Sequence, residues 1–140
     1  MEWKKSIIIS LLLLASVDAF ASDWFEIEKV GDLVISIDKT SIAELDVENY
    51  RCVAAQFILG SKVQSKGLQF DETRDMVVLN CVTNESGIYA RIYMLNDKVV
   101  SAKIPDESLT ATNIKKLNFK NVQYTPFEKI YNLVCKGELK

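Results

Sequence analysis

Apolar and polar residues alternate along much of the chain beyond residue 22, and this alternation predicts β-strands. The first two strands are expected at 24–30 and 33–38, joined by the turn pair Gly31-Asp32 as a hairpin. A third is expected at 50–59. Its alternation places two sets of side chains on opposite faces of a sheet: Val53, Ala55, Phe57 and Leu59 on one, and Cys52, Ala54 and Gln56 on the other.

The second half of the chain repeats this pattern. Strands are expected at 75–82 and 87–95, joined by residues 83–87, which are rich in turn formers and predict another hairpin. The pair Asn96-Asp97 then turns the chain into a strand at 98–104. The polar stretch 60–67 is expected to be a loop.

Three stretches do not alternate. Asp38 to Ile42 holds short polar side chains that bond nearby backbone groups, which favours one helical turn near 41–45. Residues 105–112 are polar and predict a loop. Residues 113–124 fit either a strand or an irregular segment that crosses the surface.

The end of the chain carries a helix signal. Thr125-Pro126-Phe127-Glu128 has the capping-box pattern, with proline at the first helical position. Phe127, Ile130, Tyr131 and Val134 follow at helical spacing, and Gly137 is a suitable stop. A helix of about ten residues is unstable alone in water, so it must pack on the sheet. The predicted fold is α+β: an antiparallel sheet of five to six strands with one C-terminal helix packed on it.

The first residues have the three parts of a secretory signal peptide. Lys4 and Lys5 precede an apolar run from Ile7 to Ala15, and Ala19-Phe20-Ala21 forms a small-x-small cleavage site. A membrane anchor is the alternative, but the run is shorter than the roughly 20 apolar residues that span a bilayer. The sequence therefore predicts a signal peptide at 1–21, a single exported domain at 22–140, and no integral membrane segment after cleavage.

Net charge and composition exclude several classes of function. The net charge is -2, which gives no electrostatic reason to bind nucleic acid. The chain has no histidine, which removes histidine-dependent nucleophilic catalysis and histidine metal sites. We expect no catalytic residue, metal or cofactor.

Three cysteines, an odd number, allow at most one disulfide within the chain. A bridge between Cys81 and Cys135 would join the helix to the sheet and close a loop of roughly 55 residues, worth about 4 kcal/mol in the chain-entropy model. Cys52 would then be a buried thiol. Cys52 bridging a second chain, or pairing with Cys81, remains an alternative, so the protein is expected as a monomer or a dimer.

Two groups of polar residues stand out. Tyr89, Arg91 and Tyr93 are expected on one strand face, a composition typical of partner-binding hot spots and also of an ordinary half-buried sheet face. Asp71, Glu72 and Asp75 cluster with Arg74, but their spacing fits no calcium loop, so a solvated surface is favoured over a calcium or acid–base site.

Several motifs together resemble the surface-adhesin protein E family of Gram-negative bacteria. They are Trp24 after a signal peptide, the phrase Asp38-x-x-Ser41-Ile42, the pair Asn80-Cys81, and the ending Leu133-Val134-Cys135. The resemblance implies a small antiparallel sheet with a C-terminal helix, pairing of Cys81 with Cys135, and attachment to host proteins. The family usually has Asp-Cys where this chain has Asn80-Cys81, and Cys52 is additional.

These observations favour an exported, non-enzymatic binding module, adhesin-like, that contacts a host or envelope protein from the periplasm or cell surface of a Gram-negative bacterium. A periplasmic inhibitor or immunity-type protein is the alternative.

Overall fold

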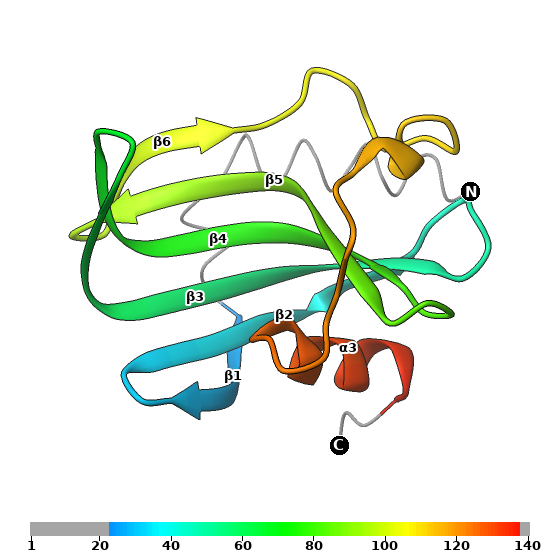
Figure 1. The fold of residues 1–140 in the computed structure, drawn as a ribbon, viewed down its shortest axis with the longest axis horizontal. Coiled ribbons are helices and arrows are strands. Elements are labelled where there is room, and N and C mark those ends of the chain that lie inside the picture. Colours follow the sequence, from blue (N-terminus) through cyan, green and yellow to red (C-terminus); the bar gives the residue numbers. More distant parts are fainter. Residues whose placement is uncertain (1–22, 138–140) are drawn as a thin grey trace.

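A computed structural model describes residues 23–137, so the predicted signal peptide lies outside the described residues. The fold is an antiparallel sheet with one helix against it (Figure 1). The α+β prediction is confirmed, with a slightly higher strand count: six strands follow in the order β1 to β6, and a short β7 pairs with β5. The elements are β1 (Trp24–Val30), β2 (Leu33–Glu44), β3 (Tyr50–Ser65), β4 (Leu68–Asn80), β5 (Glu85–Leu95), β6 (Lys98–Lys103), the 3-10 turn η1 (Ile114–Lys116), β7 (Lys120–Asn121) and α3 (Phe127–Cys135).

The sheet has a buried cluster on each face. The face covered by α3, called the helix face here, holds a cluster from β2, β3 and β4 together with the helix: Ile35, Ile37, Val53, Ala55, Phe57, Val77, Leu79, Val122, Ile130, Tyr131, Leu133 and Val134. The opposite face, called the loop face here, holds a second cluster, to which the segment after β6 contributes Leu109 and Ile114. The whole cluster is Ala43, Leu45, Cys52, Ala54, Met76, Val78, Tyr89, Ala90, Ile92, Met94, Leu109 and Ile114. The predicted division of the third strand between two faces is therefore confirmed.

The stretch 60–67 is not a loop, contrary to the prediction. β3 continues to Ser65 and β4 begins at Leu68, so the turn is only Lys66-Gly67, both with positive φ. These strand ends lie beyond the core and are exposed, so polar residues stand where apolar alternation would mark a strand. A register shift between Ile58 and Val63 surrounds Gly60, where a Cβ would come within 2.4 Å of the Asp32 Cβ. The hairpin therefore depends on glycine at 60.

The helical turn predicted near 41–45 is also wrong, because β2 runs on to Glu44. The Asp38 carboxylate accepts hydrogen bonds from the Thr40 amide (2.9 Å) and hydroxyl (2.6 Å), and the Ser41 hydroxyl donates to the Asp38 carbonyl (2.6 Å). Ser41 Oγ also accepts from the Ala54 amide of β3 (2.8 Å). The short polar side chains do bond the backbone, as expected, but the product is a register shift between Asp38 and Ala43.

The undecided stretch 113–124 combines both alternatives. It begins with η1, crosses the surface, and contributes β7, whose two residues pair with Glu85 and Ser86 of β5. Ile114 and Val122 are buried, on opposite faces of the sheet. The segment therefore wraps over the end of β5 and leads the chain to α3 (Figure 1).

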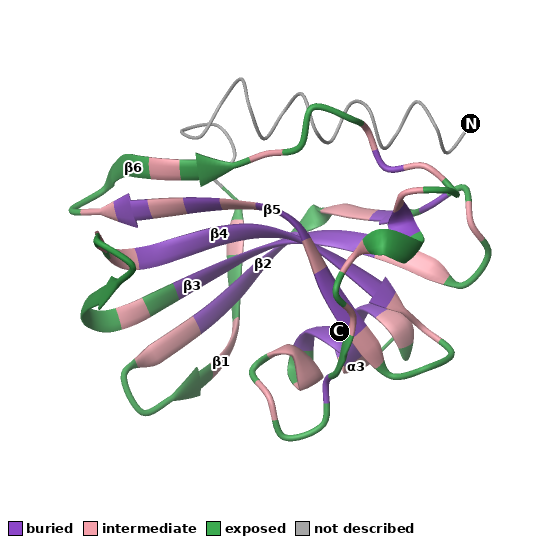
Figure 2. Cartoon of the chain, turned by 45° about the horizontal axis from the view of Figure 1, so that its top comes forward, coloured by how far each residue is buried: buried purple, intermediate pink, exposed green. Residues whose placement is uncertain are grey.

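The two edge strands are more exposed than the centre. Figure 2 shows β3 and β4 mostly buried along their middle, whereas β1 and β6 are mainly exposed or intermediate. Because the sheet is open, both β1 and β6 have a neighbour on one side only in the described strand order.

Candidate functional site

The candidate residues of β5 do not share one face. β5 pairs Ala90 with Met76 but Ile88 with Val77, so Tyr89 is an extra residue in a bulge. The bulge turns Tyr89 into the loop-face cluster, where its hydroxyl donates a hydrogen bond to the Glu107 carbonyl. A one-residue irregularity reverses the alternation that the sequence implies. Tyr89 therefore has a packing role, and only Arg91 and Tyr93 remain together.

Arg91 forms a two-point ion pair with Asp75 on the neighbouring strand. Its Nε and Nη2 donate to the two carboxylate oxygens, each at 2.8 Å. Asp75 is 0% exposed, and the Arg91 side chain is 29% exposed. Burial raises the pKa of Asp75, although the hydrogen bond from Arg91 and its charge oppose that rise. The hydrogen bond to Asp75 in turn raises the pKa of Arg91, so the guanidinium stays charged.

Tyr93 is surrounded by one aromatic ring and two cations. Phe70 on β4 meets its ring edge-on, with 4.9 Å between ring centres. The Arg91 guanidinium lies 5.9 Å and the Lys103 ammonium 5.7 Å from the centre of the Tyr93 ring. At these distances the ring quadrupole attracts the cations. We call Phe70, Arg91, Tyr93 and Lys103 the Tyr93 cluster. Tyrosine and arginine are among the residue types most enriched in binding hot spots.

A shallow hollow of about 220 Å³ adjoins this cluster on the helix face. It lies between the strands and the start of α3, where the Phe57 and Phe127 rings are 5.3 Å apart between centres. Its lining is mostly apolar, with Arg91 as the charged member: Leu33, Phe57, Leu59, Phe70, Thr73, Arg91, Pro126 and Phe127. An apolar hollow beside aromatic and cationic side chains suits a side chain of a partner protein.

The sequence did not identify Phe70 and Thr73 as site residues. The predicted strand begins at Asp75, so the prediction places residues 68–74 on neither face of the sheet. In the structure β4 begins at Leu68, and the register pairs Thr73 with Tyr93 and Val63 with Phe70. The spacing of Phe70, Glu72 and Arg74 carries no apolar alternation, so only the pairing with β3 and β5 reveals this half of β4.

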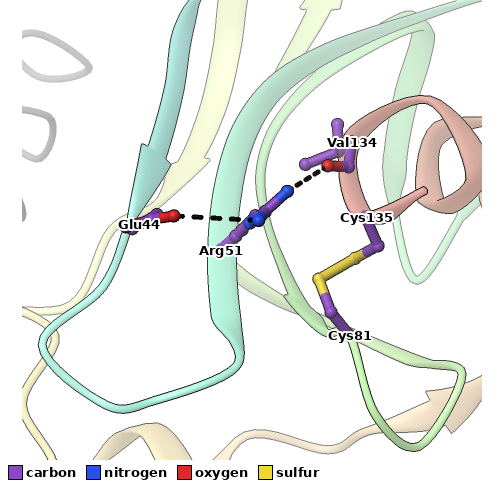
Figure 3. A network of polar contacts seen from close by, with 5 residues as sticks. All are labelled: Glu44, Arg51, Cys81, Val134 and Cys135. Atoms are coloured by element: carbon purple, nitrogen blue, oxygen red, sulfur yellow. Dashed lines mark hydrogen bonds and ion pairs between the residues drawn. A yellow bond between two sulfur atoms is a disulfide. The ribbon is translucent and has the colours of Figure 1, made fainter. Parts of the chain in front are cut away.

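The helix wall of the hollow is held by two contacts at the far end of α3 (Figure 3). A disulfide joins Cys81 to Cys135, with Cα atoms 5.3 Å apart, as the resemblance implied. Arg51 Nη1 donates to the Val134 carbonyl at 2.6 Å, and Arg51 Nη2 lies 3.7 Å from Glu44 Oε1. A cation at a helix C-terminus satisfies a carbonyl left without an intrahelical donor and opposes the helix dipole.

The start of α3 follows the prediction only in part, because the helix begins at Phe127 and Pro126 stands at the N-cap position rather than at the first helical position. The Thr125 hydroxyl accepts from the Phe127 amide at 3.1 Å and donates to the Val122 carbonyl at 2.6 Å. Glu128 Oε1 accepts from the Tyr124 amide at 3.3 Å, one residue before the threonine that a capping box would use. Gly137 follows the helix with φ 68°, in keeping with its role as a stop.

The carboxylates of Asp71, Glu72 and Asp75 do not form one site. Asp75 faces Arg91, whereas Glu72 accepts from Arg74 Nε (2.7 Å) and Gln56 Nε2 (2.9 Å) on the other side of the strand. Asp71 accepts from the Asn96 amide at 3.3 Å. The expected solvated surface is wrong for Glu72 and Asp75, which are both buried. The reason is strand alternation, which sends neighbouring acids to opposite faces, each beside an arginine. Within residues 23–137 no group of three or more Cys, Asp or Glu is arranged to hold a metal ion.

Cys52 lies in the loop-face cluster and is fully buried in the fold. The Cys81–Cys135 disulfide takes the other two cysteines. A sulfur without exposed surface is out of reach of a second chain while the domain stays folded. The structure therefore favours the buried-thiol interpretation of Cys52 over an intermolecular bridge.

Comparisons with protein-family models, with curated proteins and with solved structures found no match. The resemblance to the surface-adhesin protein E family therefore stays a prediction. No helix in the described part of the chain combines the length and the apolar character that a membrane crossing requires.

Proposed function

We propose that this protein is an exported, non-enzymatic binding module, adhesin-like, that contacts a host or envelope protein through the Tyr93 cluster and the hollow beside it. The observation that carries the proposal is the arrangement around Tyr93. Two cations and a second ring surround a half-buried tyrosine, and two of these neighbours, Phe70 and Arg91, also line the apolar hollow. Such a site buries an apolar anchor of a partner and offers charged groups at its rim.

The Asp75–Arg91 ion pair holds the Tyr93 cluster rigidly, which favours a binding role over a catalytic one. Asp75 and Arg91 satisfy each other, and Asp75 is buried below the surface that a partner reaches. The chain has no histidine to act as a general base near neutral pH. A firmly paired arginine on a strand offers a fixed guanidinium edge, which lowers the entropy lost on binding.

The disulfide and the predicted signal peptide support export. Disulfides persist in oxidising compartments such as the periplasm and the cell surface. The resemblance to the surface-adhesin protein E family adds the Gram-negative envelope as the setting.

The site is tested by photo-cross-linking in the source bacterium and with host matrix proteins. A photo-reactive phenylalanine analogue replaces Tyr93 in one variant and Val82 in a control variant. Val82 is 69% exposed in the turn between β4 and β5, away from the hollow. We expect one discrete adduct from position 93, lost when unlabelled wild-type protein competes, and no such adduct from position 82. The same adducts from both positions, or none from position 93, would contradict the proposed site.

The compartment is tested by protease treatment of intact cells, with a periplasmic protein as marker. Digestion of this protein while the marker survives supports attachment to an external partner. Protection until osmotic shock would remove the adhesin role and leave a periplasmic inhibitor or immunity-type protein as the function to test.

A further inference from the structure

We propose that the outer edge of β6, which has no further strand beside it among residues 23–137, binds an extended, acidic segment of a partner protein, which adds to the sheet as a further antiparallel or parallel strand. This inference rests on the proposed binding function and names the chemistry of the partner. It concerns the backbone edge of β6 and the side chains of Lys98, Val99, Val100 and Lys103, and not the hollow.

The first argument is the open backbone edge. β6 pairs with β5 and stands last in the described strand order. Within residues 23–137, the turn and loop hydrogen bonds between backbone groups include none from 98–103. Alternate N–H and C=O groups of an edge strand point away from its neighbour and can pair with another strand. Adding a peptide strand to such an edge is a common mode of recognition.

The second argument is the apolar surface of this edge. Val99 is 47% exposed and Val100 is 42% exposed, although both stand in a strand. The register shifts between Tyr93 and Met94 of β5, which leaves Val100 as an extra residue between Ser101 and Val99. Val99 pairs with Met94 and so lies on the loop face. A strand laid against β6 would cover these valines with its own apolar side chains.

The third argument is charge. Lys103 is paired with Arg91, and Lys98 with Leu95, which places both lysines on the helix face. An added strand with acids on that face and apolar residues on the other would match both sets of neighbours. Opposite charges that face each other across strands stabilise the pairing, and like charges destabilise it.

The same lysines argue against a second copy of β6 as the occupant. In the antiparallel register that pairs all six residues of two copies, Lys98 of one copy faces Lys103 of the other. Lysine at an edge is a usual defence against such self-association. The edge is therefore selective, since it repels its own copy and accepts an acidic strand.

The position of β6 also connects this edge to the Tyr93 cluster. Lys103 belongs to both, because its ammonium lies 5.7 Å from the centre of the Tyr93 ring. Figure 1 shows β6 beside β5 at the border of the sheet, on the opposite side from β1. A segment lying along β6 would pass directly beside the cluster on the helix face.

The test uses the purified protein and a short synthetic peptide in which glutamate alternates with valine. A second peptide has lysine in place of glutamate, and a third has the glutamate sequence with alternate backbone nitrogens methylated. We expect measurable binding of the glutamate peptide alone, by calorimetry. We also expect slower hydrogen exchange at alternate amides of 98–103 when it is present. N-methylation removes backbone donors while keeping every side chain. Loss of binding by the methylated peptide would therefore show that backbone pairing, and not charge attraction alone, holds the peptide.

Chain variants complete the test. Lys98→Glu replaces attraction with repulsion and should weaken the glutamate peptide roughly three- to tenfold while it permits the lysine peptide. Lys29→Glu is the matched control, since Lys29 is an exposed lysine on β1, at the other end of the strand order. Equal binding of the methylated peptide, an equal effect of Lys29→Glu, or concentration-dependent self-association without peptide would each overturn the inference. Failure to obtain the cross-linked adduct from position 93 would refute the proposed site around Tyr93, but it would not affect the peptide-binding result at β6.

Discussion

At the scale of single residues, the Asp75–Arg91 pair is the most consequential polar contact on the helix face. The sequence does not predict this pair, because the two residues are far apart along the chain and meet only through the register of β4 and β5. Breaking a buried pair leaves an uncompensated charge, whereas replacing both members by apolar residues is often tolerated.

Asp75→Ala is therefore expected to lower the free energy of unfolding by about 3 kcal/mol, and Asp75→Leu with Arg91→Leu by much less. Urea denaturation of the single and the double variants measures this. Asp106→Ala is the control, because Asp106 is an exposed loop residue. A double variant no more stable than the single variant would contradict this expectation.

The same carboxyl makes stability depend on pH. Burial raises the pKa of Asp75 above its ordinary 3.8, so the folded state holds this proton more tightly than the unfolded state. The stability that this tighter proton binding adds to the folded state is fully present below pH 3.8, and it is lost as the pH rises through the raised pKa of Asp75. We expect the wild type to lose stability relative to Asp75→Asn over that interval. Unfolding midpoints of both proteins along a pH series test it; parallel curves would contradict it.

At the scale of elements, short irregularities decide which residues meet. The bulge at Tyr89 moves that side chain to the loop face, and the shift after Asp38 lets β2 continue where a helical turn was expected. Bulges depend on pairing with a neighbouring strand, so local alternation does not reveal them. The helix, in contrast, was predicted well, because its cap and its apolar face are local in sequence.

The contact between α3 and the sheet depends on the disulfide. Cys81→Ser or Cys135→Ser opens a loop with a sequence separation of 54 and should lower the free energy of unfolding. The chain-entropy model gives a loss of about 4 kcal/mol. Cys52→Ala should cost only about 1 kcal/mol, since it removes a small buried group without a cross-link.

Thermal melting of the three variants, with and without a reducing agent, separates these outcomes. The reducing agent should bring the wild type to the level of Cys81→Ser. Equal losses in all three variants would contradict the assigned pairing.

At the scale of the whole molecule, stability is expected to decline from the centre of the sheet to its edges. β3 and β4 are paired on both sides and buried along their middle (Figure 2), whereas β6 has one described neighbour and exposed valines. Backbone amides in buried, doubly paired strands open only with much of the fold.

Hydrogen exchange should therefore be slowest in the middle of β3 and β4 and faster in the edge strands β1 and β6. Mass spectrometry of pepsin fragments measures this order. Equal protection of β6 and β3 in dilute protein would mean that the β6 edge is already covered, and would also contradict the free edge on which the strand-addition inference depends.

The sequence by itself determined the features that are local: the α+β class, most of the strands, the division of β3 between two faces, and the capped C-terminal helix. Periodicity, turn residues and caps act over a few neighbouring positions, so they can be read along the chain. Only the tertiary structure decided the extent of the β3–β4 hairpin, the place of Tyr89, the burial of Glu72 and Asp75, and the meeting of Phe70, Arg91, Tyr93 and Lys103. These depend on strand register, which is set by pairings between distant segments, and one added residue reverses every face beyond it.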